Sequence, residues 1–225
     1  MSAAYELPAV LGAWVAGEWQ PPPGGAPTLP LLDPATEAEL ARLAVDEAAT
    51  VDAAVAAARQ SFAAGVWAGR SVGERQAVLR RVAAGIRDRA DELAALESLN
   101  TGIPLRQCRD RHLPRAILNF EFFADFIGQA RDDAWHQRPG LMTVVKHDPA
   151  GVAALLSPWN APLALATMKL AGALAFGNSC VLKPSELAPA PFVPLMEILK
   201  AAGVPAGVVN LVNGPGPVTG AALVA

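Results

Sequence analysis

The chain has 225 residues, of which 52% are hydrophobic and 17% are charged, and its formal net charge is −3. A chain of this length and composition can bury a sizeable core, which excludes a disordered protein. The small negative charge, with no block of like charges, excludes a basic surface for nucleic acid or for an anionic membrane.

The N-terminal residues carry no targeting signal. The first basic residue is Arg42, so the charged start of a secretory signal is missing, and Glu6 and Glu18 argue against a transit peptide. The two cysteines, Cys108 and Cys180, form neither a metal-ligand pattern nor a disulfide framework. We therefore expect a cytoplasmic protein with no metal site.

Residues 1–130 are expected to form an N-terminal unit, an extended arm followed by helices that pack on the rest of the protein. The first 35 residues are rich in proline and glycine, and two short stretches, 14–19 and 29–32, suggest strands. We expect this arm to serve packing rather than chemistry.

Two helix starts follow the arm. Thr50 is predicted as an N-cap with Asp52 in the first turn, and the helix should end near Gly65. Ser71, with Glu74 three residues later, predicts a capping box at the start of the next helix.

Apolar side chains at helical spacing mark three stripes in the rest of this unit. Stripes of this kind are typical of packed helices, so we expect the aromatic residues among them to lie in the core rather than at a cofactor. The three stripes are Val78, Val82 and Ile86; Leu93, Leu96 and Leu99, which run to Gly102; and Leu118, Phe122 and Phe126.

Residues 131–150 are expected to form a hairpin of the kind used in oligomers, because 141–145 is short and β-branched. The next stretch, 149–168, has no charge and is long enough to suggest a membrane span. However, its central prolines and Asn160 would break a membrane helix and leave a polar amide in lipid. A strand, a turn and a helix are the better interpretation.

From residue 151 the pattern alternates between apolar strands and helices. We predict an α/β fold in which 151–225 is a Rossmann-like parallel βαβαβ unit, an incomplete cofactor-binding domain. The predicted strands are 152–156, 180–182 and 208–212, and the predicted helices are 162–176 and 191–202.

Each predicted strand is followed by an unusual polar or glycine-rich turn, at 157–160, 183–186 and 213–216. The carboxyl ends of parallel strands meet at one edge, where open α/β sheets bind their ligands. Simpler alternatives exist for each turn. Asn160 could cap the next helix, Lys183 could be a solvated charge, and the glycines could form an ordinary turn before a helix.

The order of motifs resembles the aldehyde dehydrogenase superfamily. The shared runs are Pro-Trp-Asn-x-Pro-Leu, then Gly-Asn-x-x-Val-Leu-Lys-Pro-Ser-Glu, then Ala-Gly-Val-Pro-x-Gly-Val-Val-Asn. Earlier matches at Asp33-Pro-Ala-Thr36, Trp67, Glu74-Arg75 and Thr101-Gly102 extend the resemblance over nearly the whole chain.

The resemblance implies an enzyme that oxidises an aldehyde or semialdehyde to a carboxylic acid with NAD, or with NADP. Asn160 would be catalytic, donating its amide to the oxyanion that forms when the family's cysteine attacks the aldehyde. Lys183 and Glu186 match positions that bind the adenosine ribose. Other matched positions would line the cofactor (Leu156, Ser157, Trp159, Asn160, Gly216 and Gly220) or the substrate tunnel (Ala161, Leu165 and Met168).

The family mechanism proceeds through a thiohemiacetal, and its nucleophilic cysteine and base glutamate match nothing in this chain. Arginines around Cys108 could lower its pKa, but a position on a surface helix is favoured, and Cys180 should be an inert residue of a buried strand. We therefore expect the N-terminal part of a dehydrogenase, inactive alone and homo-oligomeric when complete. The alternative is a non-catalytic nucleotide-binding or assembly protein. Three parallel strands ending in a truncated helix would leave a sheet edge and apolar faces uncovered, which favours the fragment and predicts poor solubility or self-association of the chain expressed alone.

Overall fold

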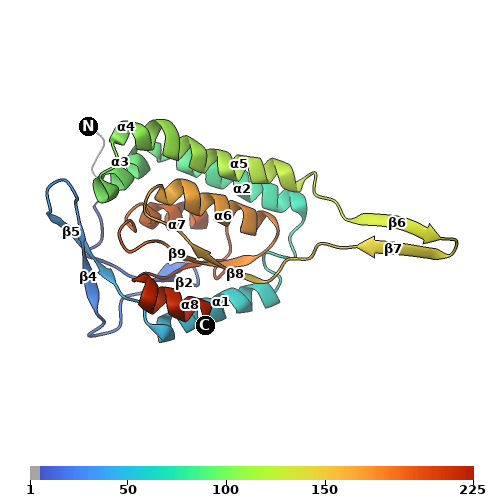
Figure 1. Ribbon diagram of the computed structural model, residues 1–225, viewed down its shortest axis with the longest axis horizontal. Coiled ribbons are helices and arrows are strands. Elements are labelled where there is room, and N and C mark those ends of the chain that lie inside the picture. The colour runs from blue at the N-terminus through green and yellow to red at the C-terminus, as the bar shows by residue number, and fades with distance from the viewer. Residues whose placement is uncertain (1–5) are drawn as a thin grey trace.

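The computed structural model describes residues 6–225 as a central sheet with helices on both faces and one projecting hairpin (Figure 1). Three parallel strands occupy one side of the sheet: β8 (Val152–Leu156), β9 (Ser179–Lys183) and β10 (Val209–Leu211). Helix α6 (Pro162–Ala175) connects the first two, and α7 (Phe192–Ala201) connects the last two. The predicted βαβαβ unit and the α/β fold class are confirmed.

The N-terminal arm completes this sheet. Strands β2 (Trp14–Val15) and β3 (Glu18–Trp19) extend it in the order β3-β2-β10-β9-β8, and β2 pairs antiparallel with β10. The expectation of an uncovered edge is therefore wrong at β10, because two strands from the far end of the sequence cover it. Among the described strands, β8 forms the other edge.

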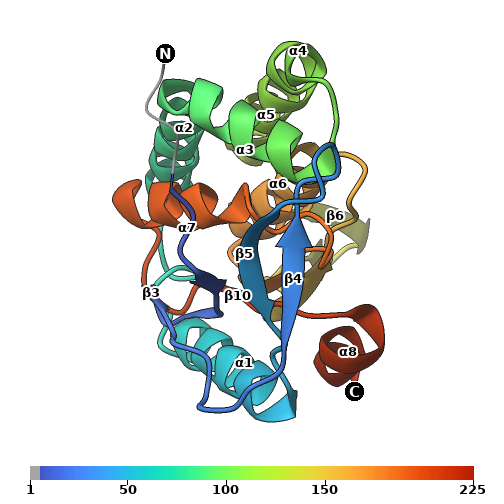
Figure 2. The same cartoon turned by 90° about the vertical axis from the view of Figure 1, so that its left-hand side faces the viewer.

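Both faces of the sheet are covered as well. Helix α1 (Ala48–Ala63) packs its buried side chains on one face, against Val181 and Val212, while α6 and α7 lie on the opposite face (Figure 2). Cys180 and Leu182 point into that second, larger core. The expectation of uncovered apolar sheet faces is thus wrong, because α1 precedes the βαβαβ unit in sequence and could not be assigned to it by pattern alone.

A second small sheet forms from the rest of the arm. Its order is β1-β5-β4, with β1 (Val10–Leu11), β4 (Thr28–Leu32) and β5 (Glu39–Ala44). The strands predicted around 14–19 and 29–32 are both confirmed. Their packing role is also visible, since Trp14 and Leu31 are buried.

The helical layer above the sheet contains α2 (Val72–Asp88), α3 (Ala90–Thr101) and α5 (Leu113–Ile127). Two short segments connect the last two: α4 (Leu105–Gln107) and a π-helical turn, η1 (Cys108–His112). The capping box at Ser71 is confirmed, because its hydroxyl accepts from the Glu74 N–H and the Glu74 carboxylate accepts from the Ser71 N–H. The stripe of α2 is buried as expected.

Two details of the helices differ from prediction. Helix α1 begins at Ala48, with Glu47 as its N-cap, because alanines at 48 and 49 continue the helix and the Thr50 N–H already donates to the Glu47 carbonyl. Thr50 is therefore inside the helix and is not its N-cap. Helix α3 ends as predicted before Gly102, which is left-handed (φ 74°), but Leu99 of its stripe is exposed.

The aromatic stripe of α5 is exposed, so the prediction that it lies in the core is wrong. Leu118, Phe122 and Phe126 are 50%, 53% and 47% exposed. Helix α5 instead buries the face that carries Ala116 and Phe120. The helix is apolar on two faces, and periodicity alone does not show which one meets the neighbouring helices.

Strands β6 (Asp133–Arg138) and β7 (Leu141–Val145) form the predicted hairpin, which projects from the body (Figure 1). Every residue of β6 is exposed, and β7 exposes Met142 and Val144. The uncharged stretch 149–168 forms strand, turn and helix as predicted. Within residues 6–225, no helix has the length and apolarity needed to cross a membrane.

Candidate active site at the carboxyl edge of the sheet

The carboxyl ends of the three parallel strands lie side by side. Leu156, the last residue of β8, is in register with Lys183, the last residue of β9. Two backbone bonds join the strand ends: the Ser157 N–H donates to the Lys183 carbonyl at 2.9 Å, and the Val212 N–H donates to the Leu182 carbonyl at 3.0 Å. The structure therefore brings the three predicted turns to one edge.

The turn after β8 is closed by a buried serine and presents two exposed side chains. The Ser157 hydroxyl donates to the Pro162 carbonyl at 3.2 Å, and Lys169 donates to the Leu156 carbonyl. Trp159, at 57% exposed, and Asn160 face solvent. The N-cap of α6 is the next residue, Ala161, with no side-chain cap. The alternative of Asn160 as a helix cap is therefore not realised.

The three predicted tunnel residues share one face of α6. Ala161, Leu165 and Met168 are spaced by four and three residues, which places them on the same side of a helix. Ala161 and Leu165 are partly exposed and Met168 is 38% exposed, in a helix whose other residues are mostly buried. This face starts beside Asn160, so an extended apolar molecule lying along it would reach the Asn160 amide with one end.

Lys183 is held in a buried position beside Glu186. Its residue exposure is only 5%, and Nζ donates to the Pro184 carbonyl at 2.9 Å and lies 3.9 Å from Glu186 Oε2. Burial lowers the pKa of Lys183, and the Glu186 charge acts in the opposite direction. Glu186 is partly exposed and lies in a turn before α7. The ammonium is thus a preorganised donor, not a freely solvated charge.

Gly220 lies against the stem of Lys183. A Cβ placed on Gly220 would sit 3.6 Å from Lys183 Cε, whereas a Cβ on Gly216 would meet nothing within 4 Å. These two predicted cofactor residues bound the π-helical turn η2 (Gly216–Gly220). Gly216 is exposed, so a ligand backbone can approach that end of the turn, whereas Gly220 is buried against Lys183.

The turn after β10 depends on a glycine that the sequence prediction did not select for the site. Gly214 has φ 136°, and a Cβ there would lie 2.1 Å from Thr219 Oγ1. The buried Thr219 hydroxyl donates to the carbonyls of Asp46 and Asn213, at 2.7 and 3.0 Å. The run Gly-Pro-Gly in the sequence was the available signal, since only a residue without a side chain fits this position.

Asp46 anchors this turn and was missed by sequence reasoning. It is 3% exposed, and its Oδ2 accepts from the Asn213 N–H at 2.6 Å. Burial raises the pKa of Asp46 to about 6, and the Asn213 N–H acts against that rise. Asp46 and the adjacent Glu47 lie between a strand and an alanine-rich helix, so nothing local in the sequence distinguishes Asp46 from a surface acid.

A cavity of about 370 Å³ adjoins the same edge. It places the aromatic Trp159 and the acid Glu186 in one concave, mostly apolar space. Its lining residues are Pro30, Leu31, Leu32, Pro34, Asn100, Thr101, Trp159, Glu186 and Leu187.

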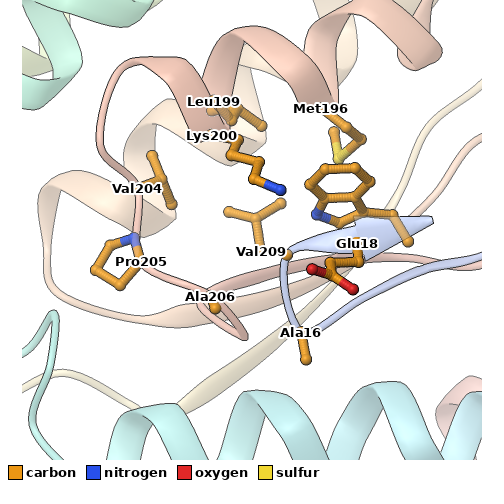
Figure 3. A pocket seen from close by; sticks show the side chains of 11 residues that line it. Ala16, Glu18, Met196, Leu199, Lys200, Val204, Pro205, Ala206 and Val209 are labelled. Carbon is orange, nitrogen blue, oxygen red and sulfur yellow. The ribbon is translucent and has the colours of Figure 1, made fainter.

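A smaller cavity, of about 180 Å³, lies at the opposite edge, where the strands begin (Figure 3). There Lys200 lies over the Trp14 ring, 5.7 Å from its centroid. This second cavity contains none of the predicted site residues, so the carboxyl edge is the better candidate.

Neither cysteine provides a reactive thiol at this edge. Cys108 is fully buried in η1, which corrects the expectation of a surface helix, and Cys180 is fully buried in β9, as expected. Burial raises the pKa of both thiols to about 12, and at Cys108 the charge of Glu97 adds to the effect. The neighbouring arginines therefore do not activate Cys108, because desolvation outweighs them.

Comparison with known proteins shows the family of the chain. Residues 19–225 match the Aldehyde dehydrogenase family. The chain belongs to this family. A relative from Pseudomonas sp. (strain CF600), 2-hydroxymuconic semialdehyde dehydrogenase, is 42% identical over 83% of the chain and 39% of the relative. The 5-carboxymethyl-2-hydroxymuconate semialdehyde dehydrogenase of Escherichia coli is 40% identical over 85% of the chain and 41% of the relative.

Solved aldehyde dehydrogenases share the fold. An aldehyde dehydrogenase of Bacillus cereus, solved as an NAD⁺ complex, superposes with a TM-score of 0.91 and 34% identity over 95% of this chain and 43% of that one. The chain therefore spans about two fifths of the length of the dehydrogenases that it matches.

Proposed function

We propose that this chain is the cofactor-binding part of an NAD(P)-dependent aldehyde dehydrogenase that oxidises an aldehyde or semialdehyde to its carboxylic acid. The observation that supports it is the meeting of Asn160, the Lys183 and Glu186 pair and the Gly216–Gly220 turn at one sheet edge. The names of the two semialdehyde dehydrogenases similar to this chain favour a semialdehyde as substrate.

The residues at this edge fit a dinucleotide. The buried Lys183 ammonium and the Glu186 carboxylate provide a donor and an acceptor 3.9 Å apart, which suits ribose hydroxyls. Leu156, Ser157 and Trp159 continue the same edge toward Asn160. When bound, the cofactor supplies the hydride acceptor. The chain itself supplies the position of that cofactor beside the reacting carbonyl.

Asn160 has the exposure that an oxyanion donor requires. Its side-chain amide forms no hydrogen bond to the rest of the described chain, so it is available to a carbonyl oxygen on which charge develops. The apolar face that carries Ala161, Leu165 and Met168 would guide the aldehyde chain toward that amide. The small Ala161 leaves room for a bulky substrate.

The nucleophile in this proposal comes from outside residues 1–225. Thiolate attack requires a deprotonated cysteine, and the pKa of each buried thiol here is about 12. We therefore expect this chain alone to bind cofactor without turning over aldehyde. The free buried cysteines fit a cytoplasmic protein, and the exposed hairpin β6–β7 would contact another subunit of a homo-oligomer.

Calorimetric titration of the 225-residue chain with NAD⁺ tests the proposal. We expect one-to-one binding that weakens about 10- to 100-fold in Lys183→Met, because a charge-assisted hydrogen bond is lost while the apolar stem is retained. Lys200→Met is the matched control, since Lys200 lies at the opposite edge (Figure 3). Equal affinities in all three proteins, with unchanged thermal melts, would refute the assigned site.

The choice between NAD and NADP is tested at Glu186. Its carboxylate would repel a 2′-phosphate, so we propose that the chain prefers NAD⁺. Glu186→Gln should narrow the difference between NAD⁺ and NADP⁺ affinities, measured in the same titration. A wild-type chain that prefers NADP⁺ would contradict this assignment while leaving the fold and the cofactor edge intact.

A further inference from the structure

Three buried side chains with different metal-binding atoms meet in the helical layer, away from the predicted cofactor turns. They are Glu97 of α3 and Cys108 and His112 of η1. Their potential ligand atoms all lie within 4.8 Å of one another. Glu97 and Cys108 are fully buried, and His112 is 8% exposed. The sequence showed no such cluster, because Glu97 is distant along the chain and the cysteines follow no known metal motif.

One carboxylate oxygen in this cluster lacks a partner. Glu97 Oε1 lies 2.5 Å from His112 Nδ1, whereas Oε2 is buried and has no hydrogen-bond partner among residues 6–225. A buried carboxylate oxygen without a partner is costly, and native proteins usually satisfy such atoms with a donor, a water or a cation. This atom therefore points to a ligand.

The backbone presents the other two groups together. Cys108 and His112 are four residues apart in a helical segment, so their side chains project from the same side, toward α3. The segment is a π-helical turn, a local widening that is common at functional sites. Two polar groups make weak contacts with the cluster: the Ile103 carbonyl is 3.9 Å from Cys108 Sγ, and Gln107 Nε2 is 3.4 Å from His112 Nε2.

The ligand chemistry selects the class of ion. A thiolate, an imidazole and a carboxylate suit Zn²⁺ and similar first-row metals, whereas Ca²⁺ and Mg²⁺ prefer oxygen ligands alone. Thiolate and carboxylate together balance the charge of a divalent ion, which is the condition for burying it. Three protein ligands leave the fourth tetrahedral position for water or a small molecule.

We propose that Glu97, Cys108 and His112 form a binding site for a divalent transition metal, with Zn²⁺ as the best fit. On binding, Cys108 Sγ–H loses its proton to solvent. His112 Nδ1 gives up the proton that it shares with Glu97, and this proton moves to Nε2 or to solvent. The Nδ1 to Oε1 separation then widens from 2.5 Å to about 3.3 Å, the spacing of two ligands in a tetrahedral zinc site.

The proposed metal site touches the start of α6 and is otherwise independent of the cofactor site. The backbone N–H of Leu163, in the first turn of α6, lies near the Glu97 carboxylate. The ion would thus tie α3 and η1 to the helix that follows Asn160. Failure of NAD⁺ binding would not affect this proposal, because its test uses the metal alone.

Titration with CoCl₂ and ZnCl₂ tests the site on the 225-residue chain, freed of any affinity tag and of metal. We expect one equivalent of Co²⁺ to give a thiolate-to-cobalt absorption band in the near ultraviolet, which Zn²⁺ then removes. Cys108→Ser should abolish the band. Glu97→Gln and His112→Gln should weaken Co²⁺ binding by about 10- to 100-fold or more.

Cys180→Ser is the matched control, because Cys180 is equally buried but lies in β9 with no ligand partners from this cluster. It should keep the band at full intensity. If the folded wild-type chain gives no band and no Zn²⁺ binding, the proposal is wrong, and this result does not depend on any variant folding. The same conclusion follows if Cys108→Ser binds Co²⁺ with an unchanged spectrum. A zinc peak between the three residues in anomalous diffraction would support it directly.

Discussion

The turns that follow β8 and β10 lie at the same sheet edge but are built in opposite ways. The turn after β10 is closed by buried bonds, in which Asp46 and Thr219 hold the backbone at Asn213 and Gly214. The turn after β8 buries only its serine and leaves Trp159 and Asn160 in solvent. One turn is a rigid support, and the other presents polar and aromatic groups to a ligand.

This difference shows that, of two neighbouring turns at a binding edge, one can contribute mainly to stability and the other mainly to ligand recognition. Changes in the β10 turn should act mainly on folding, because its polar groups bond to one another. Changes in the β8 turn should act mainly on ligands, because the Asn160 side chain contributes no described bond to the fold. Substitutions at each turn test this separation.

The largest effect is expected from Gly214→Ala. The left-handed φ and the 2.1 Å approach of the new Cβ to Thr219 Oγ1 should cost at least about 3 kcal/mol, and lower the melting temperature by about 6 to 12 °C. Gly216→Ala is the control, since its Cβ meets nothing within 4 Å. Calorimetric melts of equal midpoint for both variants would show that the turn is not rigid.

A smaller effect, dependent on pH, is expected from Asp46→Asn. The folded pKa of about 6 lies above the usual 3.8, so the protonated acid stabilises the fold, and this contribution is lost as pH rises from about 4 through 6. The loss amounts to at most about 3 kcal/mol. Asparagine does not titrate, so the variant should gain stability relative to wild type above pH 6.

Urea unfolding of both proteins at pH 4 and pH 7 measures this difference, and subtracting the two profiles removes the contribution of other titrating groups. If the free energies of unfolding of wild type and Asp46→Asn differ by the same amount at both pH values, the Asp46 carboxyl is not perturbed in the way described.

The smallest effect on stability is expected from Asn160→Ala. The side chain is exposed and its amide makes no bond to the described chain, so the free energy of unfolding should change by less than about 0.5 kcal/mol. A loss of several kcal/mol in urea unfolding would mean that both turns are structural. The proposed distinction between support and recognition would then fail.

Sequence reasoning succeeded where the determining interactions are local. The Ser71 capping box spans four residues, and the ends of the strands and helices from residue 151 are set by residues nearby in the sequence. Both appeared as predicted. The positions of Lys183 and Asn160 at one edge followed from the parallel topology alone.

The sequence could not determine burial that depends on distant partners. Phe122 and Cys108 sit on helices with more than one apolar or small-residue face, and only packing against α2, α3 and α6 decides which face is covered. The sequence could not show the roles of Asp46 and Glu97 for the same reason. Their hydrogen-bond partners are 167 and 15 residues away along the chain.

The strand β2 has a consequence for how the protein folds. The residues that flank it bond to the β10 region: the Ala16 N–H donates to Asn210 Oδ1 and the Asn213 amide donates to the Gly12 carbonyl, bonds that span 194 and 201 residues. Closing so large a loop is entropically unfavourable, and contacts of this separation slow folding. On the ribosome, the arm cannot dock before Asn213 has emerged. We therefore expect β2 docking to be a late step in folding.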